Sequence, residues 1–200
     1  MDPHIRNPNH PKKGSSTKVD PIRNEADISA IKKLLADNPR DLLLFIMGIN
    51  NGLRAGDLLK LKVGQVRRLK PGLSITIRES KTGKDNILMV NKAVAKPIKG
   101  YIDKVALGDD DYLFASRKTG KPLTIQAVNA LVKKWTLAIN LKGNYGAHSL
   151  RKTFGCVQRV KYGVGFEVLA KRFNHSSPAI TMRYLGLSSD EVNEVLMNEI

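Results

Sequence analysis

The stretch Leu73-Ser-Ile-Thr-Ile-Arg-Glu-Ser-Lys-Thr-Gly-Lys-Asp-Asn-Ile-Leu-Met-Val90 decides the fold class of this 200-residue chain. Apolar and polar residues alternate from Leu73 to Glu79, which is the period of a strand with one buried face. A second apolar run, Ile87–Val90, follows after a loop that contains Gly83. The pattern predicts an antiparallel β-hairpin. Residues 66–69 are expected to add a third strand.

The sequence before the hairpin has a helical pattern. Four aliphatic residues between positions 28 and 35 fall on one face of a helix that begins near Glu25. Asn38 followed by Pro39 starts a second helix, which continues through residues 42–49 and ends near Gly52. Residues 55–61 are expected to form a short third helix.

Helices also dominate from Asn91 onward. Apolar stripes predict helices over residues 125–139, 148–160 and 166–173, and Ser177 caps a further helix begun by Pro178. Ser188-x-x-Glu191 is a capping box that opens a last amphipathic helix. The predicted fold class is therefore α+β and mainly α, with a small antiparallel sheet or hairpin inserted early in the chain.

The N-terminal residues differ from the rest. Residues 1–23 contain four prolines and the run Gly14-Ser-Ser16, which disfavour regular structure. We expect a flexible basic N-terminal tail over 1–23 and one globular domain over 24–200. A domain of this size can be stabilised by a single hydrophobic core.

The charge of the chain points to a polyanion as partner. Lys and Arg number 34 against 18 Asp and Glu, a net charge of +16, which favours DNA, RNA or an anionic membrane over an ordinary basic protein. No apolar run is long enough to span a bilayer, and no basic amphipathic helix with an exposed apolar face is apparent. The N-terminus lacks a secretory signal, and the lone Cys156 fits a reducing cytoplasm, so we expect a cytoplasmic protein.

One pair of residues is suited to holding a phosphate, and one further arginine is placed to point into a cleft. His148 and Arg151 are three positions apart and share a helix face, where Arg offers a fork of donors and His a donor or proton acceptor. Arg54 follows Gly52 in the break between two helices, with Asp57 in the first turn of the next helix. Each feature alone is common, and a surface arginine is the simpler interpretation of Arg54.

Three further residues could carry chemistry. Lys81 lies at the hairpin tip, where a lysine is either solvated charge or a proton donor to DNA. Tyr184 needs nearby cations or a base to act as a nucleophile, because its ordinary pKa is near 10. Taken singly, Tyr184 is better explained as a core residue and His175 as a helix C-terminal cap.

Metal and nucleotide sites are not expected. The four histidines and Cys156 lack the spacing of a zinc site, and the chain has neither a phosphate-binding Gly-x-x-x-x-Gly-Lys loop nor a Gly-x-Gly-x-x-Gly motif. No compact acidic cluster suggests a two-metal nuclease. If this protein cleaves DNA, a covalent route is needed, with no cofactor and no metal.

Taken together, these residues resemble the tyrosine recombinases, or phage integrase family. The order Arg54, Lys81, His148-x-x-Arg151, His175 and Tyr184 is that of the family, and four surrounding boxes are similar to its motifs: Asn51-Gly-Leu-Arg-Ala-Gly-Asp-Leu-Leu-Lys-Leu61, Glu79-Ser-Lys-Thr-Gly-Lys84, His148-Ser-Leu-Arg-Lys-Thr-Phe154 and Asn174-His-Ser-Ser177. The resemblance covers roughly residues 25–200 and implies a catalytic domain alone, similar to small members that lack the N-terminal core-binding domain.

The resemblance implies a site-specific recombinase that cleaves and rejoins DNA through a 3′-phosphotyrosyl intermediate. Tyr184 is then the nucleophile and Lys81 the general acid, while the remaining catalytic residues, Arg54, Arg151, His148 and His175, hold the phosphate or move the tyrosine proton. Asp57 either orients Arg54 or acts as a helix N-terminal acid. Two alternatives remain open: a type IB topoisomerase-like nicking–closing enzyme, and a DNA-binding regulator that does not cleave.

The resemblance also implies partners. We expect double-stranded DNA as substrate, a homotetramer on synapsed DNA formed from a protein that is monomeric when free, and accessory DNA-bending proteins. No membrane partner is expected. The helix predicted within residues 187–200 would dock on a neighbouring protomer or pack on its own domain.

Overall fold

The first helix begins at the predicted residue, and the second begins and ends where Pro39 and Gly52 predict. The computed structural model describes residues 18–186 and Met197. In it α1 spans Glu25–Leu34 and α2 spans Pro39–Asn51. Gly52 ends α2 in the left-handed region, with φ of 57°. The next helix, α3, covers only Ala55–Leu58 and is shorter than the predicted 55–61.

The hairpin is present, but the expected third strand is not. β1 (Ser74–Arg78) pairs antiparallel with β2 (Asp85–Met89), and within the described residues the sheet has these two strands only. The prediction of a strand over 66–69 is wrong, because α4 occupies Val63–Val66. Val63 and Val66 are both fully buried, as expected of positions three apart on one helical turn, and so short an apolar pattern does not distinguish a turn from a strand.

Four of the predicted helices after the hairpin are confirmed, as α6 (Ile125–Ala138), α7 (Ala147–Val160), α8 (Phe166–Arg172) and α9 (Pro178–Leu185). A further helix, α5 (Lys92–Val105), follows Asn91, where helix was expected without stated bounds. The Ser177 side chain caps α9 by accepting a hydrogen bond from the backbone N–H of Ile180. The capping box at Ser188 lies outside the described residues.

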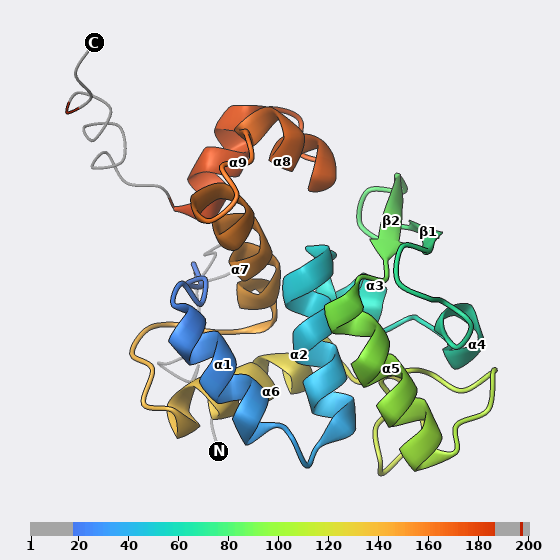
Figure 1. Cartoon of the computed structure of the whole chain (residues 1–200). Coiled ribbons are helices and arrows are strands. Elements are labelled where there is room, and N and C mark those ends of the chain that lie inside the picture. Colours follow the sequence, from blue (N-terminus) through green and yellow to red (C-terminus); the bar gives the residue numbers. More distant parts are fainter. Residues whose placement is uncertain (1–17, 187–196, 198–200) are drawn as a thin grey trace, which may run out of the picture.

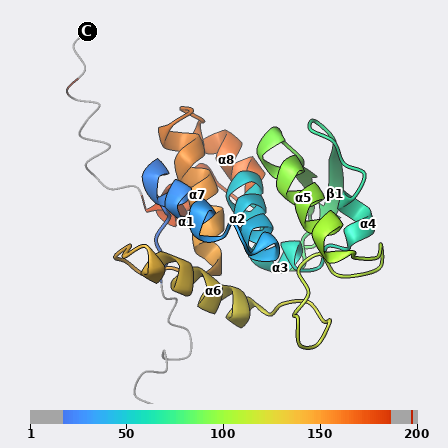
Figure 2. The ribbon, with the colours of Figure 1, turned by 60° about the horizontal axis from the view of Figure 1, so that its bottom comes forward.

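Helix α2 is the centre of the main core. It lies between α7 and α5 (Figure 1, Figure 2). Leu43, Leu44 and Phe45 of α2 are fully buried, and the Phe45 ring meets Trp135 of α6 edge to face at 6.0 Å between centroids. We call α1–α7 and the hairpin the helical body, because one continuous core joins them.

Helices α8 and α9 form a smaller unit at one end of α7 (Figure 1). Its own core of fully or nearly fully buried side chains consists of Leu169, Phe173 and Leu185. A Cβ placed on Gly155 of α7 would lie 2.7 Å from Leu185 Cδ2 and 2.8 Å from Phe173 Cζ. The α8–α9 unit is therefore packed against α7 at a place where only glycine fits.

Residues 18–23, which we expected to belong to the tail, pack on the helical body. The backbone N–H of Asp20 donates to Asn144 O at 2.7 Å. Ile22 is fully buried, and its N–H donates to Thr153 Oγ1 at 2.8 Å. The part of the predicted tail that the structure describes is thus fixed by a buried aliphatic side chain, and residues 1–17 lie outside the described residues.

Candidate active site

Arg151 connects the end of α2 with the end of α8. The side chain is buried in α7 and donates to the backbone carbonyls of Gly52 and Phe173, each at 2.7 Å. Its guanidinium carbon also lies 4.6 Å from the centre of the Phe173 ring. Burial lowers the pKa of Arg151 to about 10, so the group stays charged at neutral pH. A cation is thereby held rigidly between the body and the α8–α9 unit.

Arg54 is paired with a carboxylate that the motifs did not point to. It lies between Gly52 and α3, and its guanidinium forms an ion pair with Glu79 at the end of β1. Glu79 also accepts hydrogen bonds from Thr82 Oγ1 at 2.6 Å and from Asn86 Nδ2 at 2.8 Å. Burial alone would raise the pKa of Glu79, but these hydrogen bonds and the charge of Arg54 lower it to about 2.

A sequence signal for Glu79 exists. The inward-facing positions of β1 are Ile75 and Ile77, and Glu79 continues the same alternation. A period-two pattern that extends to an acidic residue predicts a buried carboxylate, and a buried carboxylate needs a cationic partner.

Asp57 lies in the first turn of α3, as one of its two predicted roles requires, and its side chain also binds the hairpin loop. Its Oδ1 accepts from the backbone N–H of Ser80 at 2.9 Å and from Ser80 Oγ at 2.8 Å. The carboxylate paired with Arg54 is Glu79. Asp57, which is buried, therefore anchors the hairpin loop to α3.

Lys81 lies on that loop, next to Ser80. The turn is closed by hydrogen bonds from Glu79 N to Lys84 O and from Gly83 N to Glu79 O, both 2.9 Å long. Lys81 itself is exposed. Its charge is one of the causes that lower the pKa of His148, which places the hairpin tip within electrostatic reach of α7.

The surroundings of His148 and His175 both favour the neutral form of the imidazole. The His148 side chain remains accessible, yet partial burial and the charges of Arg151 and Lys81 lower its pKa below 6.5. Burial, with the charges of Arg151 and Arg54, lowers the pKa of His175 to about 4. Neutral imidazoles can accept a proton or donate one hydrogen bond, as a reacting phosphate requires.

Local backbone geometry and a threonine fix His175. Asn174 precedes it in the left-handed region with φ of 51°, a conformation that Asn tolerates almost as well as Gly at the end of a helix. The His175 backbone N–H donates to Ala170 O at 2.9 Å. Its Nδ1 lies 2.9 Å from Oγ1 of the buried Thr181, which leaves Nε2 free to face a ligand.

Tyr184 lies in an aromatic and cationic setting. Its ring meets Phe173 and His175 edge to face, at 5.7 and 5.2 Å between centroids, and Lys152 Nζ lies 5.2 Å from the ring centre. The hydroxyl is buried and makes no hydrogen bond of normal geometry with the described residues. Burial raises its pKa, while the charges of Arg151 and Arg54 oppose that shift.

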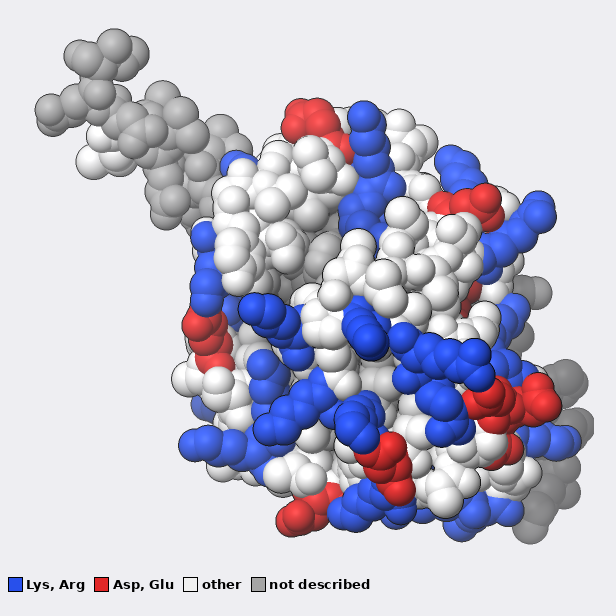
Figure 3. Space-filling model, turned by 45° about the vertical axis from the view of Figure 1, so that its right-hand side comes forward, with Lys and Arg blue, Asp and Glu red and all other residues white. Residues whose placement is uncertain are grey.

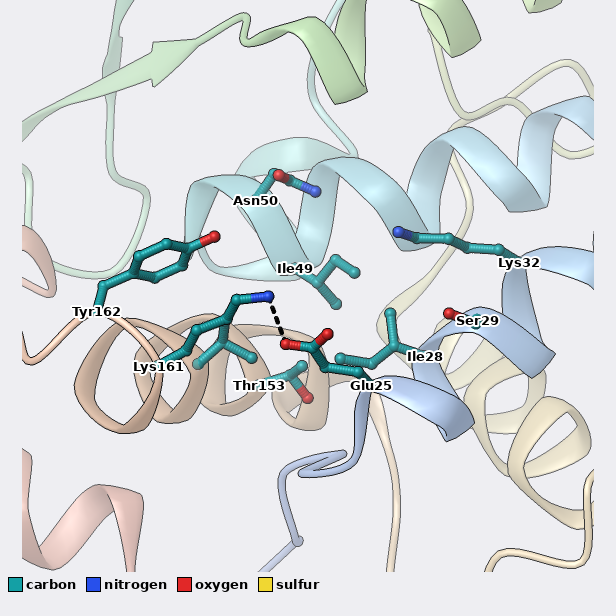
Figure 4. Close-up of a pocket in the computed structure, with 10 residues that line it drawn as sticks. Glu25, Ile28, Ser29, Lys32, Ile49, Asn50, Thr153, Lys161 and Tyr162 are labelled. Atoms are coloured by element: carbon teal, nitrogen blue, oxygen red, sulfur yellow. Dashed lines mark hydrogen bonds and ion pairs between the residues drawn. The ribbon is translucent and has the colours of Figure 1, made fainter.

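Tyr184 and His148 line one hollow of about 340 Å³, together with Lys18, Val19, Lys152, Ile180 and Arg183. The charged residues that line this hollow, Lys18, Lys152 and Arg183, are therefore all basic. A second hollow of about 200 Å³ lies between α1, α2 and α7, where Lys161 pairs with Glu25 above an aliphatic floor (Figure 4). That hollow contains none of the predicted site residues.

The wider surface is also basic. Lys and Arg side chains outnumber acidic ones on the face that carries the hairpin, α4 and α5 (Figure 3). The exposed basic residues of these segments include Arg67, Arg68, Lys70, Lys92 and Lys96. Among the described residues, no helix is both long and apolar enough to cross a membrane, and no group of three or more His, Cys, Asp or Glu side chains is arranged to hold a metal ion.

Arg172 is a further residue that sequence reasoning missed. It donates from Nε to Asn51 O at 3.0 Å and from Nη1 to Asn86 Oδ1 at 2.7 Å. These bonds tie the end of α8 to the end of α2 and to β2. No spacing rule marks such a residue, because its partners are 86 and 121 positions away in the chain.

Comparison with known proteins identifies close likenesses. Residues 22–191 match the model of the phage integrase family. The probable integrase/recombinase YoeC of Bacillus subtilis is 38% identical over 175 residues, covering 86% of this chain and 92% of YoeC. A tyrosine recombinase of Pseudothermotoga lettingae is 30% identical over 166 residues, but this match covers only 56% of that protein.

Solved structures show the same fold. The crystal structure of XerA recombinase superimposes with a TM-score of 0.73 at 19% identity, covering 92% of this chain and 66% of that one. The XerH recombinase in a post-cleavage complex with its palindromic difH substrate gives a TM-score of 0.72 at 19% identity, covering 91% of this chain and 53% of that one.

Proposed function

This chain belongs to the phage integrase family of tyrosine recombinases, and we propose that it breaks and rejoins double-stranded DNA at specific sites through a covalent bond between Tyr184 and a 3′-phosphate. The observation that carries this proposal is that the Tyr184 ring meets His175 and Phe173 at the junction of α7, α8 and α9, where Arg151 lies over the same Phe173 ring. A nucleophile, a fixed cation and a neutral imidazole are the groups that phosphoryl transfer requires.

Arg54 and Arg151 would hold the nonbridging oxygens of the scissile phosphate. Arg151 is fixed by two carbonyl oxygens, so little reorganisation is needed when negative charge develops in the transition state. Arg54 is held by Glu79 and would share its remaining donors with the phosphate. His175 would donate a hydrogen bond to the same phosphate from Nε2 while Thr181 occupies Nδ1.

In the cleavage step, Tyr184 Oη attacks the phosphorus, and the bond from phosphorus to the 5′-oxygen breaks. The tyrosine proton passes to neutral His148, and Lys81 gives a proton to the departing 5′-oxygen. In the rejoining step a 5′-hydroxyl attacks the phosphotyrosine and gives its proton to Lys81, while the phenolic oxygen of Tyr184 leaves and recovers its proton from His148. One phosphodiester replaces another in each step, so no external energy source is required.

The basic surface supports binding to DNA. The net charge of +16 and the basic face in Figure 3 suit a phosphate backbone, and several solved structures with this fold contain DNA, among them XerH with difH and lambda integrase with a core site. We further propose a homotetramer on two synapsed duplexes, in which residues 187–200 of one protomer dock on the next.

A nicked duplex that carries the site from the native locus tests this function. The nick releases a short fragment after cleavage, so the covalent adduct accumulates and can be counted on a denaturing gel. We expect adduct with the natural protein and none with Tyr184→Phe. Tyr162→Phe is the matched control, because Tyr162 is 62% exposed and lies in the hollow of Figure 4.

The same assay separates the alternatives. A natural protein that binds this duplex without forming an adduct would be a regulator. Adduct formation without joining of two different duplexes, together with relaxation of supercoiled DNA, would indicate a nicking–closing enzyme. Joined products that depend on Tyr184 would establish a recombinase.

A further inference from the structure

The loop that carries Lys81 is held on both sides by buried carboxylates. On one side Asp57 accepts two hydrogen bonds from Ser80. On the other side Glu79 accepts a hydrogen bond from Thr82 Oγ1 at 2.6 Å. A hairpin tip without such bonds would be mobile, so the position of Lys81 depends on these two acids.

Glu79 joins the loop to Arg54, one of the residues proposed to bind phosphate. Its two oxygens serve three donors: Asn86 on Oε1, and Thr82 with Arg54 on Oε2. The side chain is fully shielded from solvent. Asn86 in turn accepts a hydrogen bond from Arg172 at 2.7 Å, so the same carboxylate is also linked to the end of α8.

We propose that Glu79 is a positioning residue that fixes Arg54 and the Lys81 loop in one arrangement, so that phosphate binding and protonation of the leaving group depend on the same carboxylate. This assignment rests on the proposed function. Glu79 itself is buried behind Arg54 and the loop, and it acts through them rather than on DNA.

The proposal predicts a particular pattern of defects. In Glu79→Gln, the side chain keeps its shape but loses the charge that holds Arg54 and weakens the bond from Thr82. Misplacement of about 1 Å costs on the order of 100-fold in rate, and we expect a comparable fall in the rate of adduct formation. Asp57→Asn affects Ser80 and the loop alone, since its hydrogen bonds do not involve Arg54.

A substrate with sulfur in place of the 5′-bridging oxygen separates the effect of Glu79 on Lys81 from its effect on Arg54. A thiolate leaves without a proton because its ordinary pKa is about 8.5, so this substrate does not need Lys81. We expect the sulfur substrate to restore Lys81→Ala and Asp57→Asn almost to the natural rate. The defect of Glu79→Gln should shrink by about 10-fold and leave a remainder due to Arg54.

Two controls complete the design. Thr82→Val removes one bond to Glu79 at the exposed tip, where folding is not at risk, and should give a small defect that sulfur repairs. Glu167→Gln removes an exposed carboxylate of α8 and should have no effect on either substrate. Thermal melting of each variant reports whether it is folded.

The rates of Glu79→Gln on the oxygen and sulfur substrates either support or overturn the assignment of Glu79 as a positioning residue. Equal defects of Glu79→Gln on the oxygen and sulfur substrates would show that Glu79 does not position Lys81, and a natural rate in this variant would exclude any positioning role. Either result would overturn the assignment while the natural protein still forms adduct. Failure of the natural protein to form adduct on both substrates would overturn the proposed function, and this assignment with it.

Discussion

The helical body and the α8–α9 unit hold the proposed active-site residues in different ways. The body presents Arg54 and Arg151 from a continuous core built around α2. The α8–α9 unit presents His175 and Tyr184 from a core with only three fully or nearly fully buried aliphatic and aromatic side chains. Hydrogen bonds from Arg151 and Arg172 cross the boundary between the two. The arginines proposed to bind phosphate are thus built into the body, whereas the proposed nucleophile, Tyr184, is on a unit with less packing of its own.

Substituting Arg151, which joins the two regions, should cause the largest fall in the rate of adduct formation. Arg151→Lys keeps the charge but cannot donate to the carbonyls of Gly52 and Phe173 together. Because the cation is then no longer fixed for the transition state, we expect the rate of adduct formation to fall by about 100-fold or more.

Arg159→Lys on the same helix is the matched control, since Arg159 lies over the ring of Phe166 and outside the site. Equal rates for the two lysine variants would mean that the fixed orientation of Arg151 is unimportant.

Gly155→Ala tests whether the α8–α9 unit opens separately. The new methyl group would overlap Leu185 and Phe173, and overpacking of this kind costs about 1–3 kcal/mol. We expect faster hydrogen exchange in α8 and α9, with α2 unchanged.

Gly100→Ala in α5 is the control, because a Cβ there meets no atom within 4 Å and should stabilise the helix slightly. A uniform loss of protection across α2 and α9 in Gly155→Ala would show that the two regions unfold as one.

Acidification should weaken the smaller region first. The pKa of His175 is about 4 in the folded state against an ordinary 6.5, so the opened state binds the proton more readily. Stability that His175 contributes is present above pH 6.5 and declines as the pH falls toward 4.

We expect the free energy of opening α8–α9 to drop by about 1 kcal/mol between pH 6.5 and about 5.5. Hydrogen exchange corrected for its intrinsic pH dependence measures this drop, which His175→Gln should abolish. A drop of equal size in that variant would assign the effect to other groups.

The sequence predicts the helices and strands of both regions better than the side-chain contacts that join them. Capping residues and apolar spacing locate helices such as α2 and α9, because those signals are local. The strand expected at 66–69 failed because four residues fit a helical turn and a strand equally well. The motifs identified Tyr184 and His175 as candidate site residues. They did not identify Arg172, because its hydrogen-bond partners Asn51 and Asn86 are distant in the chain. The alternation in β1 that continues to Glu79 is a usable signal, but its pairing with Arg54 is seen only in the folded chain.

The described chain begins with Lys18 and Val19 on the wall of the hollow that contains Tyr184. Asp20 and Ile22 fasten this segment to the body. Protein engineers who graft a programmable DNA-binding module directly onto residue 18 would therefore attach its tether beside Tyr184, the proposed nucleophile. Such a tether can be short, and the register between the grafted module and the cleavage position would be set by a few residues.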